Sequence, residues 1–258
     1  MKPELRRERI VDRVRERERV SVEELAEWLG SSRETIRRDL TTLADLGRVR
    51  KYHGGATLAE VRREDRFAQR LVDAVHEKRA VAVAAAALFP RGSTIFVDVG
   101  TTTLMFADAL AGREDLTVIT NGIDIARKLA FSGVKVFIVG GEFNPETAES
   151  VGTLALEQIG RFYASDAVIT VAGLNASGAM DFQLDEAQIA RAMIAQARVL
   201  TVIADGSKLG RDALFQVCPL EAVDRLVVDR APDAPLAEAL ATAGVKVILA
   251  DPLIKLPP

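Results

Sequence analysis

Apolar residues recur at helical spacing in two neighbouring segments within residues 21–57. Each segment can bury one stripe along a helix. Gly30, between the segments, is typical of a residue that ends a helix, and Ser31 or Ser32 can cap the helix that follows. The pattern predicts a helix, a tight turn, a second helix and a short hairpin, preceded by a further helix over residues 4–18. The apolar positions are Ile10, Val11 and Val14 in the first helix, then Leu25, Leu29, Ile36, Leu40 and Leu43.

From residue 90 onward, short runs of β-branched and other apolar residues alternate with helical stretches. This alternation favours an α/β fold with a largely parallel sheet and helices on both faces. The runs contain few polar residues, as expected for strands that are covered on both faces. The predicted strands are Ile95–Val99, Leu116–Thr120, Val134–Val139, Ala167–Val171, Val199–Ala204, Leu226–Asp229 and Val245–Leu249. The predicted helices are 80–88, Leu104–Ala111, Ile123–Phe131, Asp185–Ala197 and 235–243.

The net charge of −3 hides an asymmetry along the 258 residues. Residues 1–63 contain 16 Lys and Arg against 12 Asp and Glu, a net charge of +4. The remainder contains 18 against 25, a net charge of −7. A cationic head on an acidic body is typical of a protein that contacts nucleic acid with one end only.

Composition argues against several other classes of protein. The single cysteine, Cys218, excludes an intramolecular disulfide, and His53 and His76 lie too far apart in sequence to form a metal-ligand cluster. The N-terminus is charged from Lys2 onward, and the longest apolar run, Val81–Pro90, is too short to span a bilayer. We therefore expect a cytoplasmic protein with no metal, no cofactor and no membrane partner.

Cations and hydroxyl groups cluster at the start of the predicted helix that follows Gly30, and in the hairpin after Gly47. The start of a recognition helix is where side chains meet base edges and phosphates in the major groove of DNA. The alternative is a charged helical hairpin that is only a solvated cap on a larger protein. The candidate DNA-binding residues are Ser31, Ser32, Arg33, Thr35, Arg37, Arg38, Arg50, Lys51, His53, Gly54 and Gly55.

The run TIRRDL, residues 35–40, and the run LADLGRVRKYHGGA, residues 43–56, closely resemble the N-terminal winged helix-turn-helix of the DeoR family of bacterial transcription regulators. The wing of that family usually ends in Arg-x-His-Gly-Gly-Ala, and this chain has Lys51 at the position of the arginine. Lysine keeps a cation that binds phosphate but loses the planar fork of arginine. The resemblance implies double-stranded operator DNA as a partner, with Lys51 contacting phosphate in preference to a base.

Small, hydroxylated and charged residues follow the predicted strands, where open α/β sheets bind their ligands. The segment Gly100–Thr103 opens directly into a helix, so its N–H groups and hydroxyls suit a phosphate or another anion. Lys208 adds a point charge, and carboxylates can accept hydrogen bonds from sugar hydroxyls, so a phosphorylated polyol would use both sets. Each turn taken alone is also explained as a connector, Gly140-Gly141 as a simple turn, and Lys208 as a surface cation. The candidate effector-binding residues are Asp98, Gly100, Thr101, Thr102, Thr103, Thr120, Asn121, Gly140, Gly141, Gly173, Asp181, Glu186, Asp205 and Lys208.

Residues 76–232 resemble the effector domain of the DeoR family, which is similar in fold to phosphosugar isomerases such as ribose-5-phosphate isomerase. The resemblance implies a winged helix-turn-helix domain over 1–57, a linker over 58–75 and a Rossmann-like effector-binding domain over 76–258. The stretch Asn175–Asp185 lacks a clear family match, and we expect it to shape sugar specificity. The matching segments are Asp98–Thr103, Thr120-Asn121, Gly140-Gly141, Arg191–Ile194 and Asp205–Gly210.

Members of this family mostly repress sugar-catabolic operons and are released from DNA by a phosphorylated sugar intermediate. The resemblance thus implies a repressor of a sugar or polyol catabolic operon, homo-oligomeric (dimer or tetramer) and not an enzyme. Two alternatives stay open. A regulator of an unphosphorylated sugar, sugar acid or polyol would keep the carboxylates but need Gly100–Thr103 less. A phosphosugar isomerase with a DNA-binding appendage would use Asp98, Asp181 or Glu186 as general base and Lys208 as electrostatic stabiliser.

Overall fold

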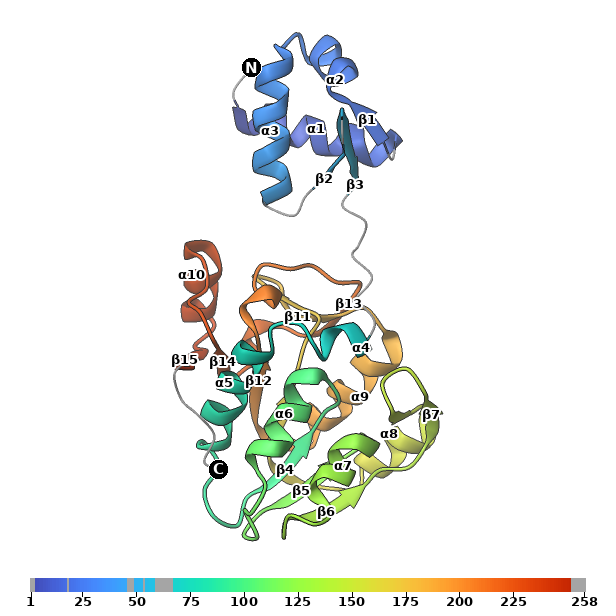
Figure 1. Ribbon diagram of the computed structural model, residues 1–258, viewed down its shortest axis with the longest axis vertical. Helices are drawn as coiled ribbons and strands as arrows, with labels where there is room; N and C mark the ends of the chain where they lie inside the picture. Colours follow the sequence, from blue (N-terminus) through green and yellow to red (C-terminus); the bar gives the residue numbers. More distant parts are fainter. Residues whose placement is uncertain (1–2, 18, 46–48, 53, 59–66, 252–258) are drawn as a thin grey trace. The chain divides into compact units, whose positions relative to one another are not determined.

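The computed structural model of the chain contains two compact units, residues 1–63 and residues 64–258 (Figure 1). Each unit has its own hydrophobic core and is described by itself. The structure describes residues 3–17, 19–45, 49–52, 54–58 and 67–251.

The N-terminal unit is a helix-turn-helix completed by a three-stranded antiparallel sheet in the order β1-β3-β2. Its core joins the apolar stripes of all three helices, among them Ile10, Leu25 and Leu40. The predicted helices and hairpin are confirmed, whereas the first strand is too short to leave a sequence pattern. The elements are α1 (Pro3–Arg17), β1 (Arg19–Ser21), α2 (Val22–Leu29), α3 (Arg33–Asp45), β2 (Val49–Tyr52) and β3 (Gly55–Leu58).

Capping residues fix where the helices of this unit begin and end. The Ser21 hydroxyl accepts a hydrogen bond from the Glu24 N–H at 3.1 Å, and the Glu24 carboxylate accepts one from the Ser21 N–H at 2.8 Å. This reciprocal capping box starts α2. Gly30 ends the helix in the left-handed conformation, with φ 58°. The Ser32 hydroxyl accepts from the Thr35 N–H at 3.1 Å, so the predicted turn between the helices is confirmed.

The second unit is built on a sheet of seven strands in the order β15-β14-β12-β9-β4-β5-β6, with every neighbouring pair parallel. All seven predicted strands are confirmed. The order of the chain reverses between β4 and β9, because the first strand in sequence lies beside the fourth. Such a reversal forms a crevice at the carboxyl ends of the strands. The strands are β4 (Thr94–Val97), β5 (Thr117–Thr120), β6 (Lys135–Ile138), β9 (Ala164–Ile169), β12 (Ala197–Ala204), β14 (Arg225–Val228) and β15 (Lys246–Leu249).

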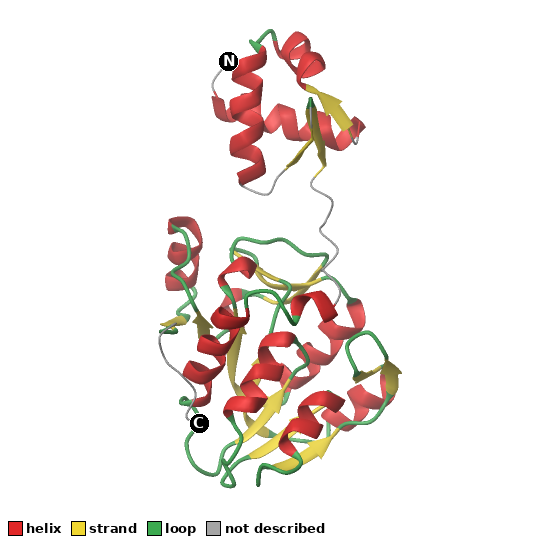
Figure 2. Ribbon diagram, viewed as in Figure 1, coloured by secondary structure: helices red, strands yellow, loops and turns green. Residues whose placement is uncertain are grey.

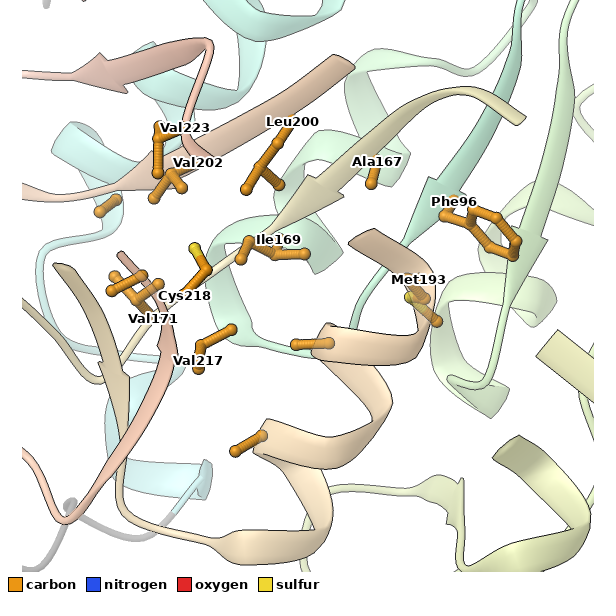
Figure 3. Packing of buried hydrophobic residues seen from close by; sticks show 14 of the residues in the cluster. Phe96, Ala167, Ile169, Val171, Met193, Leu200, Val202, Val217, Cys218 and Val223 are labelled. Atoms are coloured by element: carbon orange, nitrogen blue, oxygen red, sulfur yellow. The ribbon is translucent and has the colours of Figure 1, made fainter. Parts of the chain in front are cut away.

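Helices cover both faces of this sheet (Figure 2). Successive residues of a strand point to opposite faces. Ile95 and Val97 accordingly pack in the core with α5, α6 and α7, whereas Phe96 packs in the core with α8, α9 and α10. Figure 3 shows the second of these cores, where Phe96 and Ile169 of the sheet lie with Met193 of α9. The helices are α5 (Val75–Ala86), α6 (Thr101–Ala109), α7 (Ile123–Leu129), α8 (Thr153–Ile159), α9 (Leu184–Ala195) and α10 (Ala234–Thr242).

Several short elements have no counterpart in the sequence prediction. These strands have only three or four residues, and most of them contain Gly, Asn or Asp, so they show too little periodicity to be recognised. The stretch Asn175–Asp185 contains the turn and second strand of one such hairpin, and a four-residue helix lies inside the predicted linker, residues 58–75. The elements are α4 (Phe67–Arg70), the hairpin β7 (Glu142–Asn144) and β8 (Glu149–Val151), and the antiparallel sheet β10 (Gly173–Asn175), β11 (Gly178–Asp181) and β13 (Phe215–Cys218), with the 3-10 helices η1 (Gly206–Lys208) and η2 (Leu220–Ala222).

Three features of the described residues bear on the classes that composition argued against. None of their helices combines the length and the apolar character needed to cross a membrane. Their His, Cys, Asp and Glu side chains form no group of three or more that could hold a metal ion. Cys218 is buried and free, and burial raises the pKa of its thiol to about 11, so the thiol stays protonated near neutral pH.

Candidate DNA-binding surface and effector site

Helix α3 presents cations to solvent near its start. Arg33, Arg37 and Arg38 are all exposed. Arg33 Nε lies 3.7 Å from a carboxylate oxygen of Glu23, and Arg38 Nε lies 3.3 Å from one of Glu34. Ion pairs at such exposed positions contribute little to stability. The guanidinium groups can therefore exchange these partners for phosphates or base edges of DNA.

Buried Asp39 holds α3 against α1. Its carboxylate accepts hydrogen bonds from Arg6 Nε at 2.5 Å and from Arg7 Nε at 2.9 Å, and only 2% of the residue is exposed. A buried carboxylate is costly unless it is paired in this way. The helical pattern does not mark Asp39, because its partners lie more than 30 residues away in sequence.

The wing is the hairpin of β2 and β3. Lys51 is exposed, and its Nζ donates a hydrogen bond to Thr41 Oγ1 of α3 at 2.8 Å, so this cation lies beside the recognition helix. Of the other predicted wing side chains, Arg50 is described only as part of β2, and His53 lies outside the described residues. Contact of all three with DNA stays a prediction.

The two glycines of the wing have different roles. Gly54 is exposed with φ 101°, a backbone conformation that favours glycine. Gly55 is buried in β3, and a Cβ there would lie 2.3 Å from the carbonyl oxygen of Val20. Gly55 therefore allows β3 to pack closely on β1, a structural role that the sequence pattern does not reveal.

Many predicted effector residues gather where β4 and the neighbouring strands end, around the reversal of strand order. Gly100 follows β4, and a Cβ on it would lie 2.1 Å from the methyl carbon of Thr170, just beyond β9, so a larger residue here would have to displace the Thr170 side chain. Helix α6 starts at the next residue, and Thr101, Thr102 and Thr103 are buried. The N–H groups of a helix's first turn have no partner within the helix, which makes this turn suitable for an anion.

Thr120 and Asn121 occupy the end of β5. Thr120 Oγ1 accepts a hydrogen bond from the Gly122 N–H at 3.0 Å and so shapes the turn. The fully buried Asn121 side chain donates through Nδ2 to Glu149 Oε2 at 2.9 Å and to the Ser150 carbonyl at 3.1 Å. Its Oδ1 has no hydrogen-bond partner among the described residues, although buried polar atoms are seldom left unsatisfied. A ligand hydroxyl that donates to this oxygen would satisfy it.

Three carboxyl groups of this region, those of Asp98, Glu149 and Asp181, are buried. Burial raises the pKa of Asp98 well above its ordinary value, and the charges of Glu149 and Asp181 raise it further. Burial also raises the pKa of Glu149, although hydrogen bonds from Thr147 and Asn121 oppose this effect. Buried carboxyl groups with raised pKa values gather at functional sites. A protonated carboxyl group can both donate to and accept from a sugar hydroxyl.

Asp181 and Glu186 lie around the start of α9. Asp181 Oδ1 accepts hydrogen bonds from the N–H groups of Phe182 at 2.6 Å and Gln183 at 3.1 Å, so it also shapes the turn into the helix. Glu186 is half-buried in the first helical turn, a position that favours acidic side chains. Local structure thus accounts for part of both choices, and contact of either residue with an effector stays a prediction.

Two buried lysines lie near Asp205, at the end of β12. Lys208 is 8% exposed and Lys78 of α5 is 3% exposed, so the alternative that Lys208 is a surface cation is wrong. Burial lowers the pKa of Lys78; the charge of Asp205 opposes that shift and the charge of Lys208 adds to it. Asp205 Oδ1 accepts from the Ser207 N–H at 3.0 Å and caps η1. Lys78, which the sequence pattern does not single out, adds a second buried cation to this region.

Three predicted glycines serve the backbone. Gly140 is exposed after the edge strand β6, and its N–H and C=O bond the Gln158 side chain at 3.2 Å and 2.9 Å. A Cβ on Gly141 would lie 2.5 Å from a backbone oxygen of β8. A Cβ on Gly173 would lie 2.3 Å from the Arg211 carbonyl oxygen. These contacts support the alternative that Gly140-Gly141 is a turn, and they give Gly173 a packing role.

The two units together define a class of protein. The first is a winged helix-turn-helix with exposed cations at the start of α3, the second helix of the helix-turn-helix motif, where such domains contact DNA. The second has a polar interior at the strand ends of an α/β sheet, where small ligands bind. The class is a DNA-binding transcription regulator with a sensor domain.

Comparison with known families gives the same answer. Residues 6–62 match the DeoR-like helix-turn-helix domain, and residues 73–230 match the DeoR C-terminal sensor domain. The chain belongs to the DeoR family of transcription regulators.

Curated relatives are similar along almost their whole length. The HTH-type transcriptional repressor CsqR of Escherichia coli (strain K12) is 32% identical over 95% of this chain and 94% of its own. The glycerol-3-phosphate regulon repressor of the same organism is 30% identical over 93% of this chain and 96% of its own. Among solved structures, ribose 5-phosphate isomerase A of Methanocaldococcus jannaschii has a TM-score of 0.38 and 16% identity, over 51% of this chain and 53% of that one.

Proposed function

We propose that this protein is a repressor that binds operator DNA through α3 and the wing, and that a phosphorylated sugar or polyol releases it. The observation that carries the effector class is the composition of the buried region at the strand ends. The start of α6 and two buried lysines suit an anionic group. Asp98, Glu149 and Asn121 Oδ1, which has no hydrogen-bond partner among the described residues, suit hydroxyls. A ligand that carries both kinds of group uses the whole region. The name of the glycerol-3-phosphate regulon repressor, a relative, supports the same ligand class.

Release from DNA follows from linkage between the two sites. The effector must bind more tightly to the arrangement of heads that does not fit the operator. A coupling free energy of about 1–3 kcal/mol changes DNA affinity roughly 5–150-fold, enough to switch transcription. Such a regulator works in the cytoplasm, as a homo-oligomer that reads paired half-sites.

In this proposal the buried carboxyl groups bind the effector and do not catalyse its conversion. The names of the curated relatives, which are repressors, support a protein without enzymatic activity. Incubation with a bound phosphosugar, followed by NMR of the recovered ligand, tests this point. Conversion of an aldose phosphate into a ketose phosphate would establish the isomerase alternative.

A thermal-shift screen against paired compounds tests the effector class. Glycerol and glycerol 3-phosphate, and other sugars with their phosphates, are compared at equal concentration. We expect one phosphorylated compound to raise the melting temperature and its unphosphorylated partner to have no effect, since binding to the native state stabilises it. Stabilisation by a free sugar alone would instead favour a sensor of unphosphorylated ligands.

The variant Thr101→Glu places a carboxylate at the start of α6, where the phosphate is expected. We predict that it abolishes the response to the phosphorylated compound and leaves DNA binding intact, because like charges repel at this position. DNA binding is measured by gel-shift titration on a sequence selected from a random pool. Thr242→Glu, which adds the same charge at an exposed residue at the end of α10, is the matched control. An unaltered effector response in Thr101→Glu would refute the phosphate assignment.

A further inference from the structure

We propose that Arg70, in the short helix α4, binds the anionic group of the effector. This inference rests on the proposed function and extends it to a segment between the two matched regions, which are residues 6–62 and 73–230. Helix α4 comes after the winged helix-turn-helix and before the matched part of the sensor domain, yet its side chains lie at the candidate site.

The placement of α4 is shown by Phe67. Its side chain is only 9% exposed, and it borders a small cavity between the start of α6, the start of α7 and the turn before β8. Helix α4 therefore covers the helix starts that follow β4 and β5.

The guanidinium group of Arg70 lies over the Phe67 ring, with its central carbon 5.3 Å from the ring centroid. Its charge acts on two buried groups from different elements. Burial raises the pKa of Glu149 of β8 and lowers the pKa of Lys78 of α5, and the positive charge of Arg70 acts to lower both values. The Phe67 ring under this guanidinium group borders the same cavity as Gly100 and Thr147, and Thr147 donates a hydrogen bond to Glu149. The half-buried Arg70 therefore lies at the edge of the candidate site, near Glu149 and Lys78.

The backbone of Arg70 is held in place from inside the protein. The ammonium group of Lys78 donates hydrogen bonds to the Arg70 carbonyl at 2.5 Å and to the Asp73 carbonyl at 2.7 Å. The Leu71 N–H bonds the Phe67 carbonyl at 3.0 Å and closes the helical turn. Binding a ligand therefore requires no ordering of this backbone, and only the Arg70 side chain loses conformational freedom.

Arginine suits a phosphate for a geometric reason. Its planar fork donates two parallel hydrogen bonds to one phosphate, whereas a lysine offers a point charge. With Lys78 and Lys208 nearby, Arg70 gives this region three cations that a phosphate dianion can neutralise. Only residues 59–66 separate β3 from α4 along the chain.

The affinity of full-length variants for inorganic phosphate, from thermal shifts at increasing concentration, tests the inference. We expect Arg70→Gln to weaken binding roughly 10–100-fold, the effect of losing charge-assisted hydrogen bonds. The affinity of Arg70→Lys should lie between those of the wild type and Arg70→Gln. Arg79→Gln makes the same change at an exposed position of α5 and should bind as the wild type does. Wild-type affinity in Arg70→Gln, or equal loss in Arg79→Gln, would overturn the assignment.

Chemical protection of the wild-type protein gives an answer that does not depend on variant folding. Phenylglyoxal modifies guanidinium groups, and mass spectrometry measures its rate at each arginine. We expect phosphate to protect Arg70 and not Arg79; equal rates at Arg70 with and without phosphate would count against the proposal. If Thr101→Glu loses phosphate binding while Arg70→Gln keeps it, this inference fails and the proposed effector class stands. If the wild type binds no phosphate or phosphorylated compound, both fail.

Discussion

At the scale of single residues, Asp98 is placed where its charge is costly to the fold. Burial, with Glu149 and Asp181 nearby, raises its pKa well above that of an exposed aspartate. A carboxyl group with a raised pKa stabilises the folded protein fully below its ordinary pKa, and that contribution is lost as the pH rises through the raised value. At neutral pH the site is therefore stabilised by whatever keeps Asp98 neutral or donates hydrogen bonds to it, and sugar hydroxyls do the latter.

The variant Asp98→Asn tests this interpretation, because asparagine keeps an acceptor oxygen and cannot ionise. We predict that it raises the free energy of unfolding at pH 8 by on the order of 1–3 kcal/mol, and by much less near about pH 4, where the wild-type carboxyl group is protonated. Urea unfolding at both pH values measures the difference. An equal effect at both would contradict the prediction.

Asp115→Asn is the control of opposite sign. The hydrogen bond from Arg113 lowers the pKa of Asp115, so the contribution of this carboxylate is present above its ordinary pKa and is lost as the pH falls through the lowered value. We expect this variant to lose stability at pH 8, where Asp98→Asn gains it. Both measurements use the same unfolding conditions.

At the scale of elements, the strands and helices follow from local pattern, and the contacts that position them do not. The seven sheet strands are predictable because short apolar, β-branched runs are hard to mistake. The edge strands β6 and β15 are largely exposed, so the expected covering on both faces holds only for the strands between them. The segment Gly100–Thr103 and Asn121 are predictable because they directly follow two of these strands. Glu149 is not predictable, since it lies in a three-residue strand and contacts Asn121, 28 residues away in sequence. Lys78 is not predictable either, since Asp205, whose charge acts on it, lies far away in sequence. Such contacts leave no periodic signal.

The pairing of α1 with α3 through Asp39 gives a prediction at this scale. We expect Asp39→Ala to destabilise the DNA-binding unit by about 3–5 kcal/mol, because it leaves the guanidinium groups of Arg6 and Arg7 without their buried partner. A unit of this size has little stability to spare, so it should unfold below the sensor domain in a calorimetric scan. Glu34→Ala, which removes the exposed partner of Arg38, should change little. Similar effects of the two substitutions would show that the Asp39 pairing does not hold the helices together.

At the scale of the whole molecule, each unit does one part of regulation. The N-terminal unit offers one recognition helix, and one such helix reads only a short half-site of DNA. The sensor unit holds a buried polar site and contributes no recognition element of its own among the residues described. In the proposed mechanism, two heads bind one operator together, and the effector changes how well both fit at once.

We predict that the purified protein is a dimer or a larger assembly that binds paired half-sites far more tightly than a single one. A two-fold assembly places two recognition helices about one helical turn of DNA, or a multiple of it, apart. Light scattering gives the assembly state, and gel-shift titrations on DNA with one or two copies of a selected half-site give the affinities. Arg37→Ala, on the exposed side of α3, should weaken both complexes by about 1–3 kcal/mol while leaving the assembly unchanged. A monomer that binds one half-site as tightly as two would rule out the binding of paired half-sites. The effector would then have to change how a single DNA-binding unit binds its half-site.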